Sequence, residues 1–110
     1  MAQEPYPHPE IETVTLAEVL HALSDPVRLC ILRSLTPGEE TAWSAFEVKV
    51  SPSTLSHHMK VLRNAGLIQT RRDGTRCLVA FRAELSQRFP DLLETVLRLA
   101  PPSHSCEVAA

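Results

Sequence analysis

Two helices are predicted in the first third of the chain from the spacing of apolar residues. The first begins at Thr15, which has the spacing of a capping box with Glu18. Apolar residues then recur at helical intervals, at Leu16, Val19, Leu20 and Leu23. The second helix starts at Asp25-Pro26, because a side-chain acceptor followed by proline is typical of a helix start. Apolar residues surround this helix, so we expect it to be the central core helix.

Two further helices are predicted in the middle of the chain. Residues 40–49 have scattered apolar positions and are expected to form a short helix. The next helix has stronger signals, with Ser51 at the cap, Pro52 at the first helical position and Gly66 where a left-handed C-cap would fall. One side of this helix is apolar and carries Leu55, Met59 and Leu62.

Between residues 67 and 82 the period of the apolar positions changes from helical to two. Asp73-Gly74 is a hairpin turn signal, and the residues after it alternate between apolar and polar. The apolar members of the alternation are Cys77, Val79 and Phe81. We therefore expect a small two-stranded antiparallel β ribbon in an otherwise mainly α fold.

A last helix is predicted before the C-terminal tail, where apolar residues recur at steps of four and three. Pro90 either begins or kinks this helix, so its start is placed at 84 or 90. The predicted order is helix, helix, helix, helix, strand, strand, helix. With 110 residues, we expect one domain over 13–100, a mobile N-terminal arm over 1–12 and a flexible tail over 101–110.

Composition excludes several classes of function. No apolar run approaches the roughly 20 residues of a membrane span, and the N-terminus lacks the features of a signal peptide. Three cysteines without a C-x-x-C pair fit a reducing cytoplasm, where we expect the protein to act. Paired carboxylates, a nucleophile motif and a phosphate-binding glycine loop are all missing, so we do not expect an enzyme.

Positive charge is concentrated in residues 51–82, which hold six Lys or Arg and one acid, while the whole chain has a net charge of −2. A basic block on an acidic body is a directional binding surface for a polyanion. The polar side of the 51–66 helix carries hydroxyl, imidazole, amide and cationic groups, which suit base edges and phosphates in a major groove. The candidate base contacts are Ser53, Thr54, Ser56 and His57, with Asn64 on the same polar side of the helix. The candidate phosphate contacts are Lys60, Arg63 and the hairpin arginines Arg71, Arg72 and Arg76.

Three remaining side chains are interpreted as structural. His58 lies at the margin of the apolar side of the 51–66 helix, and we expect it to be a hydrogen-bonded histidine of the core boundary. Cys30 and Cys77 lie at apolar positions and are expected to pack as small hydrophobic residues.

Three stretches together resemble the ArsR/SmtB family of bacterial winged helix-turn-helix regulators. They are residues 24–29 (SDPVRL), 53–68 (STLSHHMKVLRNAGLI) and 71–76 (RRDGTR), and the resemblance covers about residues 15–99. It implies a homodimeric regulator, more often a repressor, on an imperfect inverted repeat of double-stranded DNA. It also implies pairing through the first and last helices, with the interface residues Leu16, Leu20, Phe89, Leu92, Leu93, Val96 and Leu99.

The resemblance does not identify an effector. Arsenic sensors of the family resemble one another in a Cys-x-Cys-x-x-Cys pattern, whose matching positions here are Glu40, Ala42 and Ala45. Residues 83–100 contain no histidine, unlike the last helix of the zinc sensors.

Three alternatives remain open from the sequence. The two ends of the chain could supply nitrogen and sulfur ligands for nickel, zinc or cobalt, from His8, His104 and Cys106. A dithiol switch between Cys30 and Cys106 would instead make the regulator respond to thiol oxidation. A winged-helix module that docks an acidic protein partner on its basic face is the third alternative.

Overall fold

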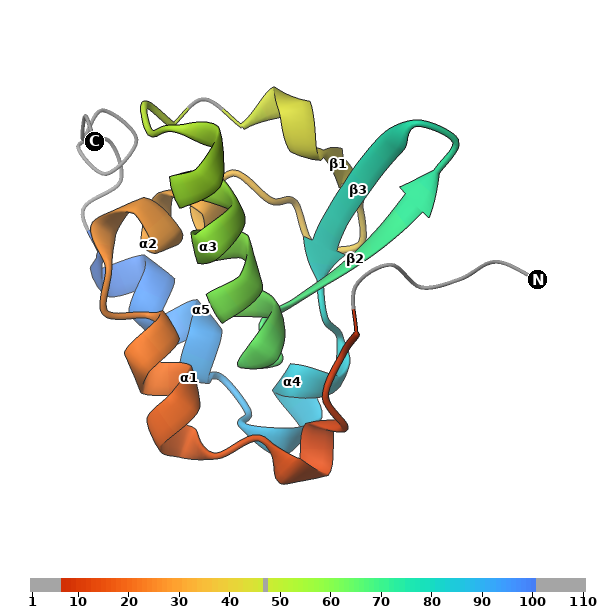
Figure 1. Cartoon of the computed structure of the whole chain (residues 1–110). Coiled ribbons are helices and arrows are strands. Elements are labelled where there is room, and N and C mark those ends of the chain that lie inside the picture. The colour runs from red at the N-terminus through yellow and green to blue at the C-terminus, as the bar shows by residue number, and fades with distance from the viewer. Residues whose placement is uncertain (1–6, 47, 101–110) are drawn as a thin grey trace.

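The computed structural model describes residues 7–46 and 48–100, and Figure 1 shows helices gathered on one side of a projecting β hairpin. The elements in chain order are η1 (Ile11–Thr13), α1 (Leu16–Ala22), α2 (Pro26–Arg33), β1 (Thr41–Ala42), η2 (Trp43–Ala45), α3 (Pro52–Asn64), β2 (Ile68–Asp73), β3 (Arg76–Phe81), α4 (Glu84–Arg88) and α5 (Leu92–Leu99). This is the predicted winged helix-turn-helix arrangement, with α2 and α3 as the helix pair and β2–β3 as the wing.

The three caps predicted from sequence are confirmed. Thr15 and Glu18 form a complete capping box at the start of α1. The Asp25 carboxylate accepts hydrogen bonds from two backbone N–H groups of α2, and Ser51 Oγ accepts one from Thr54 N at 3.2 Å. These caps fix where the helices begin, and therefore which of their side chains face the core.

The helix predicted over residues 40–49 is wrong. Thr41–Ala42 forms the strand β1, which pairs antiparallel with β3 through Thr41–Val79 and Ala42–Leu78, and a single 3-10 turn, η2, follows. The sheet consequently has three strands in the order β1-β3-β2 rather than the two predicted. The pairing occurs because one edge of β3 carries unpaired backbone groups, which a segment without helical periodicity can satisfy.

The region of the predicted last helix contains two helices, so both proposed starts correspond to a helix boundary. α4 covers Glu84–Arg88, and α5 follows after a break at Pro90 and Asp91. Asp91 adopts a left-handed backbone with φ of 64°, which turns the chain between the two helices.

One hydrophobic core joins the helices to the sheet. Its centre contains Ile31 and Leu32 of α2, Met59 and Leu62 of α3, and Val79 of β3, all fully buried. The inner side of α3 is therefore fixed by the core, while its other side faces outward (Figure 1).

Residues 7–9, which the sequence placed in a mobile arm, lie against the body. The carbonyl oxygens of Pro7 and Pro9 accept hydrogen bonds from Arg63 and Arg82. Nε2 of His8 accepts a hydrogen bond from the backbone N–H of Thr70 at 3.0 Å. The described part of the arm thus contacts both α3 and the wing. None of the described helices is long and apolar enough to cross a membrane.

Candidate nucleic-acid interface

The outward face of α3 is polar and open to solvent. The exposed side chains on this face are Ser53, Ser56, His57, Lys60 and Asn64, while Thr54 is half-buried. The Thr54 hydroxyl accepts a hydrogen bond from Ser51 Oγ at 2.9 Å, so it contributes to the cap as well. No acidic residue occurs in α3. A helix with these properties can present donors and acceptors to a duplex groove.

Arg63 does not share this exposed face. Its side chain is only 7% exposed, and its Nε donates to the carbonyl oxygen of Pro7 at 3.2 Å. The helical wheel placed Arg63 on an open flank, because the wheel takes no account of the arm segment that covers it. With the guanidinium turned to the protein backbone, we omit Arg63 from the candidate phosphate contacts.

The wing presents three exposed arginines near its tip, and they differ in charge environment. Nε and Nη2 of Arg71 bind both carboxylate oxygens of Glu40, at 2.6 and 2.8 Å. These hydrogen bonds lower the pKa of Glu40 and raise that of Arg71, so both groups stay charged and neutralise each other in part. Among the described residues, no carboxylate forms an ion pair with Arg72 or Arg76. These two side chains are the stronger candidates for phosphates.

Arg28 connects the end of α1 to α3 from inside the protein. It is 6% exposed, and its Nε and Nη2 donate to the carbonyl oxygens of Ala22 at 2.8 Å and His21 at 3.2 Å. Its Nη1 lies 3.1 Å from Nδ1 of His58, which must accept because a guanidinium only donates. The sequence analysis missed this role, although an arginine inside an apolar helix is itself a signal of a buried polar contact.

His58 is 8% exposed, which confirms the prediction of a hydrogen-bonded structural histidine. Burial is the main reason that its pKa is lowered. The positive charge of Arg28 and the neighbouring His57 lower this pKa further, while Asp25 acts in the opposite direction. The neutral ring keeps Nδ1 available to Arg28, so α3 is held in place by a contact that requires an unprotonated histidine.

The residues predicted to form a dimer interface fall into two groups. Leu16, Leu20 and Leu99 are exposed large hydrophobic side chains, at 48%, 48% and 76%. The others are half-buried against the core and are Phe89, Leu92, Leu93 and Val96. No residue of α5 is fully buried, although five of its eight residues are apolar.

The metal and redox hypotheses depend partly on residues outside the described ranges. His104 and Cys106 both lie there, whereas the ring of His8 contacts the wing through Thr70. Within residues 7–46 and 48–100, no three side chains of the metal-binding types lie together. Cys30 is 1% exposed and disulfide-bonded, so it is more than the small packing residue that the sequence predicted, whereas Cys77 is half-buried and free.

The chain is similar to known regulators over most of its length. The family model for bacterial regulatory proteins of the arsR family matches residues 25–70, which run from α2 into β2. An uncharacterised HTH-type transcriptional regulator, YceK of Bacillus subtilis, is 38% identical over 84 residues, covering 73% of this chain and 84% of that protein. An arsenical resistance operon repressor of Staphylococcus xylosus is 45% identical over 79 residues, covering 71% and 72%.

A solved structure also matches. The crystal structure of NolR from Sinorhizobium fredii superimposes with a TM-score of 0.56 at 34% identity, covering 73% of this chain and 81% of that one. The proteins matched by sequence are named as regulators and repressors, and none of those named here is an enzyme.

Proposed function

The chain belongs to the ArsR family of bacterial regulatory proteins and is a DNA-binding transcription regulator, and from this premise we propose that it acts as a homodimeric repressor. Each subunit would place α3 in a major groove and its wing along the adjacent backbone. The binding site would be an imperfect inverted repeat, because a two-fold dimer presents the same surface twice.

The observation that supports this proposal best is the outward face of α3 beside the wing. Ser53, Thr54, Ser56 and His57 would contact bases, and Lys60 with Asn64 would position the helix on the backbone. Arg72 and Arg76 would neutralise phosphates, with a smaller contribution from the partly neutralised Arg71.

The second support is the exposed apolar surface formed by α1 and α5. Three side chains that a monomer leaves exposed would be buried when two subunits pair, and these are Leu16, Leu20 and Leu99. Removing this apolar surface from water would stabilise the dimer. Pairing on this side would place the two α3 helices about 34 Å apart, one duplex turn, as in other dimers of this kind.

The signal that the protein responds to is also a proposal, and it is less specific than the DNA-binding surface. Relatives include repressors of arsenical and mercury resistance operons, so metal-responsive regulation occurs among similar proteins. The cysteines of the arsenic sensors are replaced here, and Glu40 at one of those positions is paired with Arg71. We retain a nickel, zinc or cobalt ion bound by His8, His104 and Cys106 as the candidate signal.

This function is tested by binding to the DNA upstream of the protein's own coding sequence. We expect a dissociation constant of about 10⁻⁸ M or tighter at physiological salt, the range of specific complexes. The same titration is repeated with nickel, zinc, cobalt, arsenite and a thiol oxidant, each alone, and a change with one of them identifies the signal. Micromolar binding to every promoter fragment would favour the protein-interaction module instead.

A further inference from the structure

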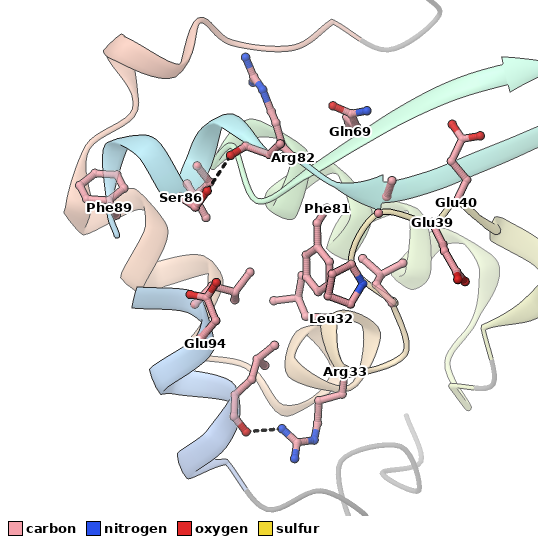
Figure 2. Close-up of a pocket in the computed structure, with 18 of the residues that line it drawn as sticks. Leu32, Arg33, Glu39, Glu40, Gln69, Phe81, Arg82, Ser86, Phe89 and Glu94 are labelled. Carbon is pink, nitrogen blue, oxygen red and sulfur yellow. Dashed lines mark hydrogen bonds between the residues drawn. The ribbon is translucent and has the colours of Figure 1, made fainter. Parts of the chain in front are cut away.

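A cavity of about 860 Å³ lies between the end of α2, the base of the wing, α4 and α5 (Figure 2). Its volume is within the range of roughly 300–1,000 Å³ that is usual for small-molecule sites. None of the candidate DNA contacts lines it. The cavity is therefore separate from the surface assigned to nucleic acid.

The walls of the cavity are mainly apolar. Leu32 and Leu85 are buried in its floor, at 0% and 3% exposure. Half-buried side chains from three different segments form the sides, and these are Phe81, Phe89, Leu93 and Leu97. Figure 2 shows Phe81 near the middle of the cavity and Phe89 at its edge, where the guanidinium of Arg88 lies 4.9 Å from the ring centre of Phe89.

Polar contacts hold the walls in position at two places. Nη1 of Arg33 donates to the carbonyl oxygen of Leu97 and so joins α2 to α5. On the other side, the pair between Glu40 and Arg71 joins the loop after α2 to the wing. Because the elements are tied to one another, the cavity does not depend on a single loop.

The charged groups of the lining are either occupied or at the rim. The Arg82 guanidinium points away from the cavity in Figure 2 and donates to Glu84 and to the Pro9 carbonyl, both at 2.6 Å. Arg33 and Glu40 are engaged as described above. The remaining charged side chains of the lining are exposed, and they are Glu39, Glu94 and Arg98. The apolar interior thus offers no charge of its own to a ligand.

From this arrangement we propose that the cavity binds an uncharged, largely apolar organic molecule, with aromatic compounds preferred. Apolar surface leaving water would supply the affinity, and the rim would keep polar substituents in contact with solvent. A net charge on the ligand would be disfavoured, because burying an ion without a partner carries a large free-energy cost.

The cavity and the proposed subunit interface share Phe89 and Leu93, but the rest of each uses a different side of α5. Leu93 and Leu97 are on the side that lines the cavity, whereas Leu92, Val96 and Leu99 fall on another side of the helix at 100° per residue. The other α5 residues of the proposed interface therefore lie outside the cavity. The proposal does not rest on DNA binding and can fail or hold independently of it.

The test uses two fluorescent dyes with the same arylamine skeleton on the full-length protein. N-phenyl-1-naphthylamine is uncharged, and 8-anilino-1-naphthalenesulfonate is its anionic counterpart. We expect saturable binding of the uncharged dye with one site per chain, about tenfold or more tighter than the anionic dye. Non-saturable binding, or equal affinity for the two dyes, would overturn the proposal.

Two variants locate the dye without altering the core. Ala83 and Ser86 line the cavity but are exposed, so Ala83→Trp and Ser86→Trp should fill it while the melting temperature stays close to that of the parent. Each should weaken the uncharged dye about tenfold. The matched control is Ala45→Trp, at an exposed position outside the cavity, which should leave dye binding unchanged. Equal binding by all three folded variants would place the dye elsewhere and contradict the assignment.

Discussion

The outward face of α3 and the outer side of α1 and α5 are both open to solvent, but their chemistry is opposite. On α3 the exposed groups are hydroxyls, an imidazole, an amide and Lys60. On α1 and α5 they are large aliphatic side chains, with Leu99 at 76% exposure. Exposing a leucine side chain to water is unfavourable in free energy for a monomer, whereas exposing a serine side chain has little cost.

This difference is the reason that we propose a different partner for each surface. Polar and cationic groups that keep their hydration until binding suit a solvated, charged duplex. Aliphatic groups suit another apolar surface, and the same surface on a second copy is the simplest one available. Arg28 links the helices that carry the two surfaces, since it hydrogen-bonds both the end of α1 and His58 of α3.

The largest effect is expected from a charge on the apolar surface. Leu20→Glu removes two leucines per dimer, at about 1.5–3 kcal/mol each, and would bury two carboxylates. The dimer dissociation constant should therefore rise about 100-fold or more, measured by sedimentation equilibrium. His21→Glu adds the same charge to the polar side of α1 and serves as the control. Unchanged association of Leu20→Glu would remove α1 from the interface.

A somewhat smaller effect is expected from cutting the link between the surfaces. Arg28→Met leaves the buried Nδ1 of His58 and two carbonyl oxygens without their donor, so the free energy of unfolding should fall by about 2–3 kcal/mol. Urea unfolding measures this loss. Arg72→Met changes the same residue type at an exposed wing position and should have little effect. A comparable loss in both variants would show that Arg28 has no special structural role.

Substitutions on the outward face of α3 should alter sequence preference. Ser56→Ala or His57→Ala is expected to cost about 1–2 kcal/mol on the preferred duplex and less on others, because the variant side chain can no longer hydrogen-bond a base edge. Competition binding against duplexes with single base changes measures the preference. Ser86→Ala removes an exposed hydroxyl of α4, outside α3 and the wing, and is the control. If neither α3 variant changes the preference, α3 is not the helix that reads the bases.

The wing arginines should affect all duplexes alike, and by a smaller amount. Arg72→Ala or Arg76→Ala should reduce the slope of log affinity against log salt by about one unit, because one phosphate is no longer neutralised in each variant. Arg71→Ala should reduce it less, because Glu40 already neutralises part of its charge. An effect of Arg71→Ala larger than the other two would show that the Glu40 pair opens on DNA.

The smallest effect concerns pH. The pKa of His58 lies below its ordinary value of 6.5 in the folded protein, mainly through burial, so between the two pKa values the unfolded chain binds more protons. Stability from this group is complete above about pH 6.5 and declines as the pH falls toward the folded-state pKa. Urea unfolding at pH 7.5 and 5.5 measures the decline, and His58→Gln should show less of it. An equal decline in both proteins would assign the effect to other groups.

The sequence predicted the elements that local signals determine. Ser51-Pro52 and Thr15 with Glu18 specify their helix starts through backbone hydrogen bonds within one turn, and these starts are where the structure has them. The segment around Thr41 was mispredicted, because its conformation depends on pairing with Val79, 38 residues along the chain. Long-range pairing leaves no mark on local periodicity.

The candidate DNA-binding residues could also be predicted only where local signals determine their positions. Helical periodicity distinguishes the polar side of α3 from the side that carries Met59 and Leu62. The surface positions of Ser56, His57 and Lys60 could therefore be predicted from the sequence. The burial of Arg63 depends on Pro7, 56 residues away, and the contacts of Arg28 depend on how α1 meets α3. Such contacts between distant segments need the fold itself.

The most direct test of the account is the number of chains bound to DNA. A duplex from the protein's own upstream region, carrying its inverted repeat, is compared with one in which a single half of that repeat is scrambled. Two chains per intact duplex are expected, with affinity falling about 100-fold or more when one half-site is scrambled, because both α3 helices of a dimer contribute. A single chain per duplex, bound equally well to both, would contradict the account.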